Sequence, residues 1–275
     1  MDKRFLSFIL FFSLCFSLFA QTAMRITVEE ENGQLTIIRS QGRVKELLIP
    51  ESINGMPITA IGEGAFTRRG LTLVTIPDTV TEIAEGAFAY NELSTLVIGN
   101  NVEAIGRGAF SNNRLSDVSL GTGLVSIGMG AFAVNELVRL DIPDSVTYIE
   151  PYAFFYNRLT NVTIPDNVIS IGEGAFSNNR IHSVVIGNSV EAIGDGAFFN
   201  NLITAITIPG SVSTLGKRVF ESRITRRASV PPIDYVDVTG ELLFTTSNNF
   251  DNYFSSTGRR VGRYNFSRSG WAFEE

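Results

Sequence analysis

The chain repeats one pattern of apolar and polar positions every 22 residues. Each copy has a Phe that ends an Ala-Phe or closely related pair, and aliphatic residues follow it at five, eight and ten positions. Self-similarity at a period of about 20–50 residues is typical of a solenoid, in which each coil buries its apolar side by stacking on its neighbours. We expect the phenylalanines to stack through the core as one column: Phe66, Phe88, Phe110, Phe132, Phe154, Phe176, Phe198 and Phe220.

The spacing within each copy predicts two short inward-facing segments. In the copy that begins at Phe66, Val74 and Ile76 lie two residues apart, so they point to the same side of a strand. The residues at positions seven and nine then point outward. Pro77 ends this strand, and the aliphatic pair Val80 and Ile83 predicts the second segment.

An asparagine stands three residues after the Phe in six successive copies. Asparagine tolerates a left-handed backbone, and its amide bonds main-chain groups that a buried turn leaves unpaired. We therefore predict a structural ladder rather than a binding role for Asn91, Asn113, Asn135, Asn157, Asn179 and Asn201. The next position predicts a stripe of surface ion pairs between coils: Glu92, Arg114, Glu136, Arg158 and Arg180.

The first 20 residues have the features of a secretory signal peptide: a basic start at Lys3-Arg4, an apolar run over residues 5–19 and a small residue, Ala20. The apolar run is too short to span a bilayer comfortably. Cys15, the one cysteine, offers an alternative lipid-attachment site, although the bulky Leu14 before it disfavours that use.

The segments on either side of the repeats predict end caps. Residues 21–45 predict a β-hairpin around Asn32-Gly33 that covers the first open coil edge. Residues 46–221 form the predicted solenoid, and its first coil carries a five-residue insertion at 53–57. Residues 222–275 predict a C-terminal cap or appendage, with a short helix at 249–256 and strands at 261–266 and 270–273.

The repeat resembles a known family. The string at residues 127–146, Ile-Gly-Met-Gly-Ala-Phe-Ala-Val-Asn-Glu-Leu-Val-Arg-Leu-Asp-Ile-Pro-Asp-Ser-Val, is similar to the BspA-like, or treponemal-type, leucine-rich repeat. The resemblance covers about residues 46–220 and implies an α/β to mainly β fold, a right-handed solenoid with a parallel sheet on one face. It also implies a bacterial secreted or surface protein with adhesin-like relatives, and it supplies no catalytic motif. One coil departs from the pattern, because residues 150–154 lack its glycines.

Charge and composition narrow the function. The formal net charge is −6, and removal of residues 1–20 takes away Asp2, Lys3 and Arg4, which together carry +1, to leave −7. This balance disfavours nucleic acid and anionic membrane as partners. The predicted mature chain has no thiol and one histidine, His182, so we expect no metal, no cofactor and no His- or Cys-based catalysis.

The outward-facing positions bring charge together in one place. Asp117, Arg139 and Asp141 stand on adjacent coils, with Asn161 on the next. Three hypotheses compete for this group: a structural ion pair between Asp117 and Arg139, a binding spot for a protein loop or glycan, and a glycosidase carboxylate pair. Asp117 and Asp141 would lie about 8 Å apart, within the range of inverting glycosidases. Arg139 would keep both ionised, which is the wrong state for a general acid.

A second candidate patch lies in the coil without glycines. Tyr148, Tyr152, Phe155 and Tyr156 form either an exposed interface or a filling for the space that the missing glycines leave.

These observations favour an exported, non-enzymatic protein, secreted or at the cell surface, that binds a protein or glycan on another cell or in the extracellular matrix through its sheet face. We expect no nucleic-acid partner and no membrane insertion after signal cleavage. The alternatives are a glycan-active enzyme that uses Asp117 and Asp141, and a purely structural envelope protein.

Overall fold

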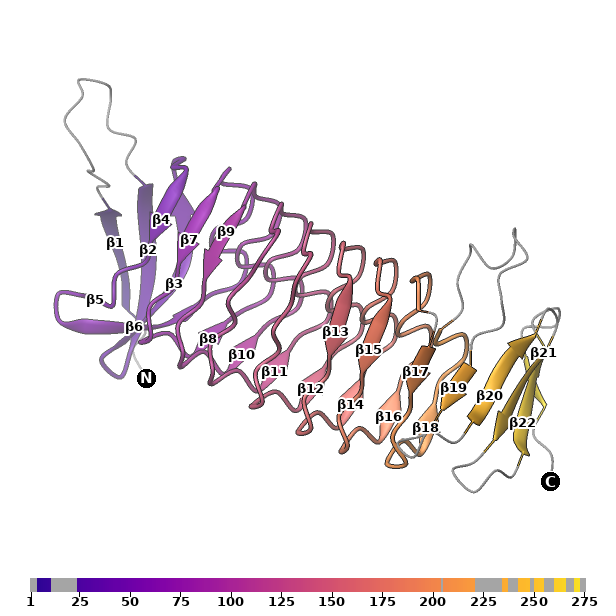
Figure 1. Ribbon diagram of the computed structural model, residues 1–275. Coiled ribbons are helices and arrows are strands. Elements are labelled where there is room, and N and C mark those ends of the chain that lie inside the picture. The colour runs from indigo at the N-terminus through magenta and orange to yellow at the C-terminus, as the bar shows by residue number, and fades with distance from the viewer. Residues whose placement is uncertain are drawn as a thin grey trace.

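The computed structural model describes residues 4–10, 24–203 and 205–220, and beyond them the strand residues 234–236, 242–247, 250–254, 260–265 and 270–272 (Figure 1). These residues form a stack of coils that is mainly β, and the described part of the chain contains no helix. Accordingly, it holds no helix long and apolar enough to cross a membrane. The predicted solenoid is confirmed. Of the predicted range from α/β to mainly β, the described residues adopt the mainly β form.

The predicted N-terminal hairpin is confirmed. Strands β2 (Met24–Glu31) and β3 (Gln34–Gln41) pair antiparallel around Asn32 and Gly33, whose φ angles are 53° and 77°. Strand β3 pairs parallel with β6 (Met56–Ile61), so the hairpin continues the sheet of the first coils. The insertion in the first coil is itself a small hairpin, in which β5 (Ser52–Ile53) pairs antiparallel with β6.

A further strand lies outside this hairpin. Strand β1 (Arg4–Leu10) pairs antiparallel with β2, from Arg4 opposite Glu30 to Leu10 opposite Met24. This strand belongs to the segment predicted to be a signal peptide. The rest of that segment, Cys15 included, lies outside the described residues.

One side of the coil stack carries a continuous parallel ladder. Its members are two-residue strands that pair in register one coil apart, as Ile105 of one coil does with Ile127 of the next. Together with β6 they form an uninterrupted path from the first coils to the last. The strands are β8 (Glu82–Ile83), β10 (Ala104–Ile105), β11 (Ser126–Ile127), β12 (Tyr148–Ile149), β14 (Ser170–Ile171), β16 (Ala192–Ile193) and β18 (Thr214–Leu215).

A second side, which we call the upper face, carries three-residue strands. Apart from the first, these strands hold the positions seven to nine residues after a core Phe. The side chains at seven and nine are exposed as predicted in residues 95–97, 161–163 and 183–185, and partly exposed in residues 73–75. The resemblance implied a parallel sheet on one face, whereas the structure has parallel pairing on two, and the upper face is the less continuous. Its strands are β4 (Glu46–Leu48), β7 (Leu73–Thr75), β9 (Thr95–Val97), β13 (Asn161–Thr163), β15 (Ser183–Val185) and β17 (Ala205–Thr207).

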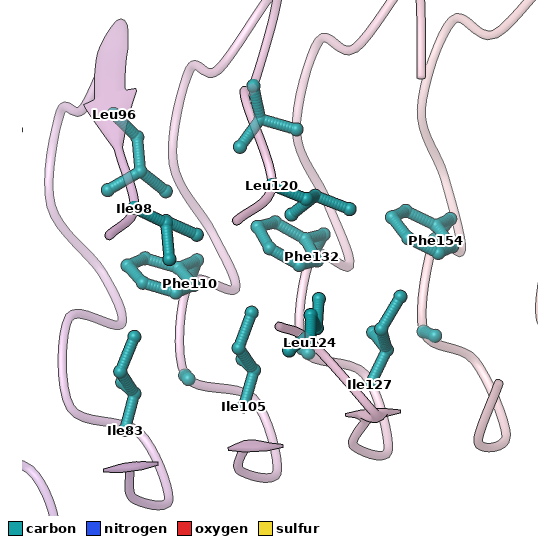
Figure 2. Close-up of a cluster of buried hydrophobic side chains, with 14 of the residues drawn as sticks. Ile83, Leu96, Ile98, Ile105, Phe110, Leu120, Leu124, Ile127, Phe132 and Phe154 are labelled. Atoms are coloured by element: carbon teal, nitrogen blue, oxygen red, sulfur yellow. The ribbon is translucent and has the colours of Figure 1, made fainter. Parts of the chain in front are cut away.

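The phenylalanine column forms the core, as predicted. Consecutive rings from Phe66 to Phe220 are stacked, with centroids 5.1–5.7 Å apart and interplanar angles of 3–16°. The seven rings from Phe66 to Phe198 have no solvent exposure. Figure 2 shows the rings of Phe110, Phe132 and Phe154 in one row, with aliphatic side chains of the two strand segments above and below them.

The predicted asparagine ladder is confirmed, with one correction. The amide of Asn135 donates to the carbonyl oxygens of Phe110 and Phe132, at 3.0 and 3.1 Å, and its oxygen accepts the N–H of Leu115 at 3.1 Å. The left-handed residue is not the asparagine but the one before it, such as Val134 with φ of 57°. The turn therefore takes its shape from one residue and its hydrogen bonds from the next.

The C-terminal strands extend the upper face. Strand β19 (Asp234–Val236) pairs parallel with β17, and the later strands follow antiparallel. The helix predicted at 249–256 is wrong, because residues 250–254 form a strand; the two strands predicted after it are present. The strands are β20 (Leu242–Ser247), β21 (Phe250–Phe254), β22 (Arg260–Asn265) and β23 (Gly270–Ala272).

Candidate functional site

The upper face is interrupted at its centre. Strands β4, β7 and β9 form one ladder, and β13 and β15 form another. Between them the pairing is reduced to one isolated bridge, from Val97 to Ser119. The coil segments 117–119 and 139–141, which are fully described, form no strand of their own. The predicted candidate residues therefore stand where the sheet opens.

Asp117, Arg139 and Asp141, which we call the charged centre, all face solvent. Asn161 is exposed beside them at the start of β13. The predicted ion pair between Asp117 and Arg139 does not form in the described part of the chain. Ion pairs that do form there include Lys45 with Glu92 and Glu136 with Arg158. The hypothesis that the charged centre is purely structural depended on this ion pair and therefore loses its main support.

The sequence explains the interruption locally. The carboxylate of Asp117 accepts the main-chain N–H of the next residue, Val118, at 3.0 Å. Short carboxylate side chains compete in this way for nearby main-chain groups, which is one reason why Asp is depleted in strands. Asp117 is thus held against its own coil. Within the described chain, the side chains of Arg139 and Asp141 make no hydrogen bond or ion pair.

Apolar side chains flank the charged centre. Val97 lies one coil before it and is 45% exposed, and Val185 lies two coils after it and is 57% exposed. Val138, adjacent to Arg139 in the chain, is 41% exposed. Of the predicted stripe of ion pairs, the described residues form only the pair of Glu136 and Arg158, in which Arg158 Nη1 is 3.0 Å from Glu136 Oε2. Glu92 pairs with Lys45 instead. The face therefore presents an open charged centre with an exposed valine on either side.

The second candidate patch divides into two parts. Phe155 lies against Tyr152 edge-on and against Tyr156 at a tilt, with ring centroids 5.9 and 6.0 Å apart, and we call these three residues the aromatic cluster. Tyr148 makes no ring contact with them and stands on β12, in the continuous ladder, 45% exposed. The aromatic cluster lies on the turns beyond that ladder, so neither group borders the charged centre.

Tyr152 occupies a position that is glycine in most coils. Its φ is 59°, and its ring lies directly over Gly174, the residue at the same position in the next coil. Its hydroxyl donates to Glu173. This hydrogen bond, together with partial burial and the negative charges of Glu173 and Asp195, raises the pKa of Tyr152 above 10.0. The ring thus covers a glycine on the surface while remaining 38% exposed.

Sequence reasoning missed other exposed apolar side chains on the turns that carry the aromatic cluster. Tyr90 is 52% exposed and lies under the guanidinium of Arg68, 4.8 Å from ring centroid to Cζ. Val134 is 38% exposed. Both stand two residues after a core Phe, as Tyr156 does, so alignment of the copies at the 22-residue period would have identified them.

No three His, Cys, Asp or Glu side chains in the described ranges come together as a metal site. His182, the one histidine, is exposed.

The family comparison matches most of the chain. The profile described as "BspA type Leucine rich repeat region (6 copies)" matches residues 43–159 and 148–270. No curated protein is significantly similar to the chain in sequence.

Solved structures of bacterial repeat proteins are similar to the chain. A leucine-rich cell surface protein from Faecalibacterium prausnitzii is 27% identical, with a TM-score of 0.57, over 86% of this chain and 58% of its own. A leucine-rich repeat protein from Bacteroides ovatus is also 27% identical, with a TM-score of 0.58, over 74% and 62%. The chain thus spans about three fifths of each. The leucine-rich repeat protein of T. pallidum shares the fold at 20% identity and a TM-score of 0.53, over 71% and 86%.

Proposed function

The chain belongs to the BspA-type leucine-rich repeat family, and from this premise we propose that it is an exported, non-enzymatic binding protein. Its upper face binds a protein or glycan on another cell or in the extracellular matrix. A long, open face of this kind suits a macromolecule better than a small substrate. The relative in Faecalibacterium prausnitzii is named a cell surface protein, which supports a surface location here.

The observation that carries this proposal is the charged centre. Asp117, Arg139 and Asp141 are exposed where the ladder is interrupted, and the expected ion pair between two of them is absent. Arg139 and Asp141 make no hydrogen bond or ion pair within the described chain, so their hydrogen-bonding capacity remains available to a partner. The exposed valines on either side supply apolar contact area around this polar centre.

The chemistry of the charged centre defines the partner. Arg139 offers a planar fork of N–H donors that fits a carboxylate, while Asp117 and Asp141 accept hydrogen bonds from hydroxyl, amide or ammonium groups. The two carboxylates outnumber the one guanidinium, so a polyanion is disfavoured. The partner is therefore a protein loop with both charges or a neutral glycan rich in hydroxyl groups.

The test is binding of the purified mature protein to extracellular-matrix proteins and to glycan arrays. We expect Asp117→Ala and Arg139→Ala each to weaken binding to the same ligands about tenfold or more, because each removes a charged contact. Arg114→Ala and Asp144→Ala are matched controls, because both side chains are exposed and lie outside the charged centre. Equal losses in the controls would overturn the site.

Two other functions give distinct outcomes in the same experiments. Turnover of a bound glycan that is lost in Asp141→Asn would favour the glycan-active enzyme. The absence of binding to every ligand would favour a structural envelope protein. Loss of binding in Tyr156→Ala but not in Arg139→Ala would move the binding site to the aromatic cluster.

A further inference from the structure

We propose that, in the mature chain, the outer edge of β2 pairs antiparallel with β2 of a second copy and joins two solenoids at their N-terminal hairpins. The inference rests on the proposed export, because cleavage after Ala20 removes β1. It concerns the opposite end of the chain from the C-terminal appendage and does not involve the charged centre.

The structure shows that this edge accepts a strand. Strand β1 covers β2 over the seven residues 24–30, in antiparallel register, with Ser7 opposite Thr27 at the centre. When β1 leaves, the main-chain N–H and C=O groups on that side of β2 lose their partners. An unpaired edge of this length is a template for another strand.

The sequence of β2 carries little to block such pairing. Natural proteins protect open edges with proline, lysine, bulges or inward-pointing charges. Strand β2, Met24–Glu31, contains neither proline nor lysine, and its acidic residues lie at one end. Its inward row, Met24, Ile26 and Val28, is fully buried while β1 is present. Removal of β1 leaves this apolar row without a neighbour on its outer side.

The charges of β2 favour a second copy as the occupant. A symmetric antiparallel pair centred on Thr27 would cover the same seven residues that β1 covers. It would place Arg25 of each copy opposite Glu29 of the other, so the pair gains two opposite-charge contacts. In the same register Ile26 stands opposite Val28 of the second copy, which continues the apolar row across the junction. An isologous contact of this kind closes at two copies.

The oligomeric state of the purified mature protein tests the proposal. Sedimentation equilibrium over a range of concentrations is expected to show a reversible dimer. Arg25→Glu should raise the dimer dissociation constant about tenfold or more, because two attractive pairs become repulsive. The double variant Arg25→Glu/Glu29→Arg should restore dimerisation. Arg39→Glu is the matched control, because Arg39 is exposed on β3, which is paired with the other side of β2.

Three results would overturn the proposal: a monomer at all concentrations, a dimer that Arg25→Glu leaves unchanged, or a double variant that stays monomeric while its melting curve matches the native protein. The mass of the exported chain reports separately whether the leader is cleaved. Asp117→Ala and Arg139→Ala should leave the dimer intact, so failure of the dimer and failure of the binding face are distinguishable.

Discussion

Asn135 donates from its side-chain amide to the carbonyl oxygen of Phe110, 25 residues earlier in the chain, at 3.0 Å. The same amide donates to Phe132 in its own coil at 3.1 Å. One asparagine therefore links two coils beside the phenylalanine column. Because the groups are buried, water cannot replace the asparagine if it is removed.

Asn135→Ala should lower the free energy of unfolding by about 2–4 kcal/mol, because it leaves the carbonyls of Phe110 and Phe132 and the N–H of Leu115 unsatisfied. Urea unfolding followed by circular dichroism measures the change. Asn161→Ala, at an exposed position, is the control and should stay within about 0.5 kcal/mol of the native value. Equal effects of the two substitutions would contradict the ladder.

Val134 offers a test in which a substitution should raise the stability, because the backbone at this residue is strained. It holds a φ of 57° at a position that other coils fill with Asn112, Asn178 and Asn200. Branched side chains are poorly suited to this left-handed region, whereas Asn tolerates it. Val134→Asn should therefore stabilise the protein by about 0.5–1 kcal/mol, seen as a higher midpoint of thermal unfolding. Val138→Asn, a similarly exposed valine without a positive φ, should bring no gain.

The repeat period was sufficient to predict most of the fold. Each coil can bury its Phe only against the coils on either side, so a Phe repeated every 22 residues must stack as one column from Phe66 to Phe220. The stacked rings and the asparagine ladder were therefore predicted correctly. The left-handed residue was misplaced by one position, because asparagine suits both roles. The pattern did not reveal that Asn135 provides the hydrogen bonds while Val134 provides the turn.

The candidate site was predictable in position but not in its contacts. The alternation along each strand correctly placed Asp117, Arg139 and Asp141 outward on adjacent coils. The sequence did not show that the ladder opens there, because pairing depends on main-chain geometry that side-chain alternation does not report. The helix expected at 249–256 failed for a related reason: the pairing of β21 with β20 and β22 overrides a weak local preference.

Gly174 provides a test of the contact with Tyr152. A Cβ at Gly174 would lie 2.5 Å from Tyr152 Cε1, and its φ is 57°. Gly86 has a φ of 60° and no neighbour within 4 Å. Gly86→Ala should thus cost about 1–2 kcal/mol for the backbone alone, and Gly174→Ala should cost more because the ring must move.

A double-mutant cycle separates these two costs. In a Tyr152→Gly background, Gly174→Ala should cost no more than Gly86→Ala, as measured by urea unfolding. If the excess cost of Gly174→Ala persists without the tyrosine ring, the contact between the two residues is not its cause.

Tyr152 should ionise at a higher pH than an ordinary tyrosine, whose pKa is 10.0. The hydrogen bond to Glu173 is the largest cause, followed by partial burial and the charges of Glu173 and Asp195, all of which favour the neutral phenol. Because the folded-state pKa is raised, the stability that this hydrogen bond contributes is fully present below pH 10 and is lost as the pH rises through the folded pKa.

The tyrosine carbon resonances, followed by NMR from pH 8 upward, measure this shift. The resonance that is absent in Tyr152→Phe identifies the group, and it should titrate above the ordinary value of about 10. Glu173→Gln should lower its pKa toward that value, because the amide still accepts a hydrogen bond but carries no charge. Titration of Tyr152 at or below the ordinary value in the native protein would show that the phenol does not donate to Glu173 in solution.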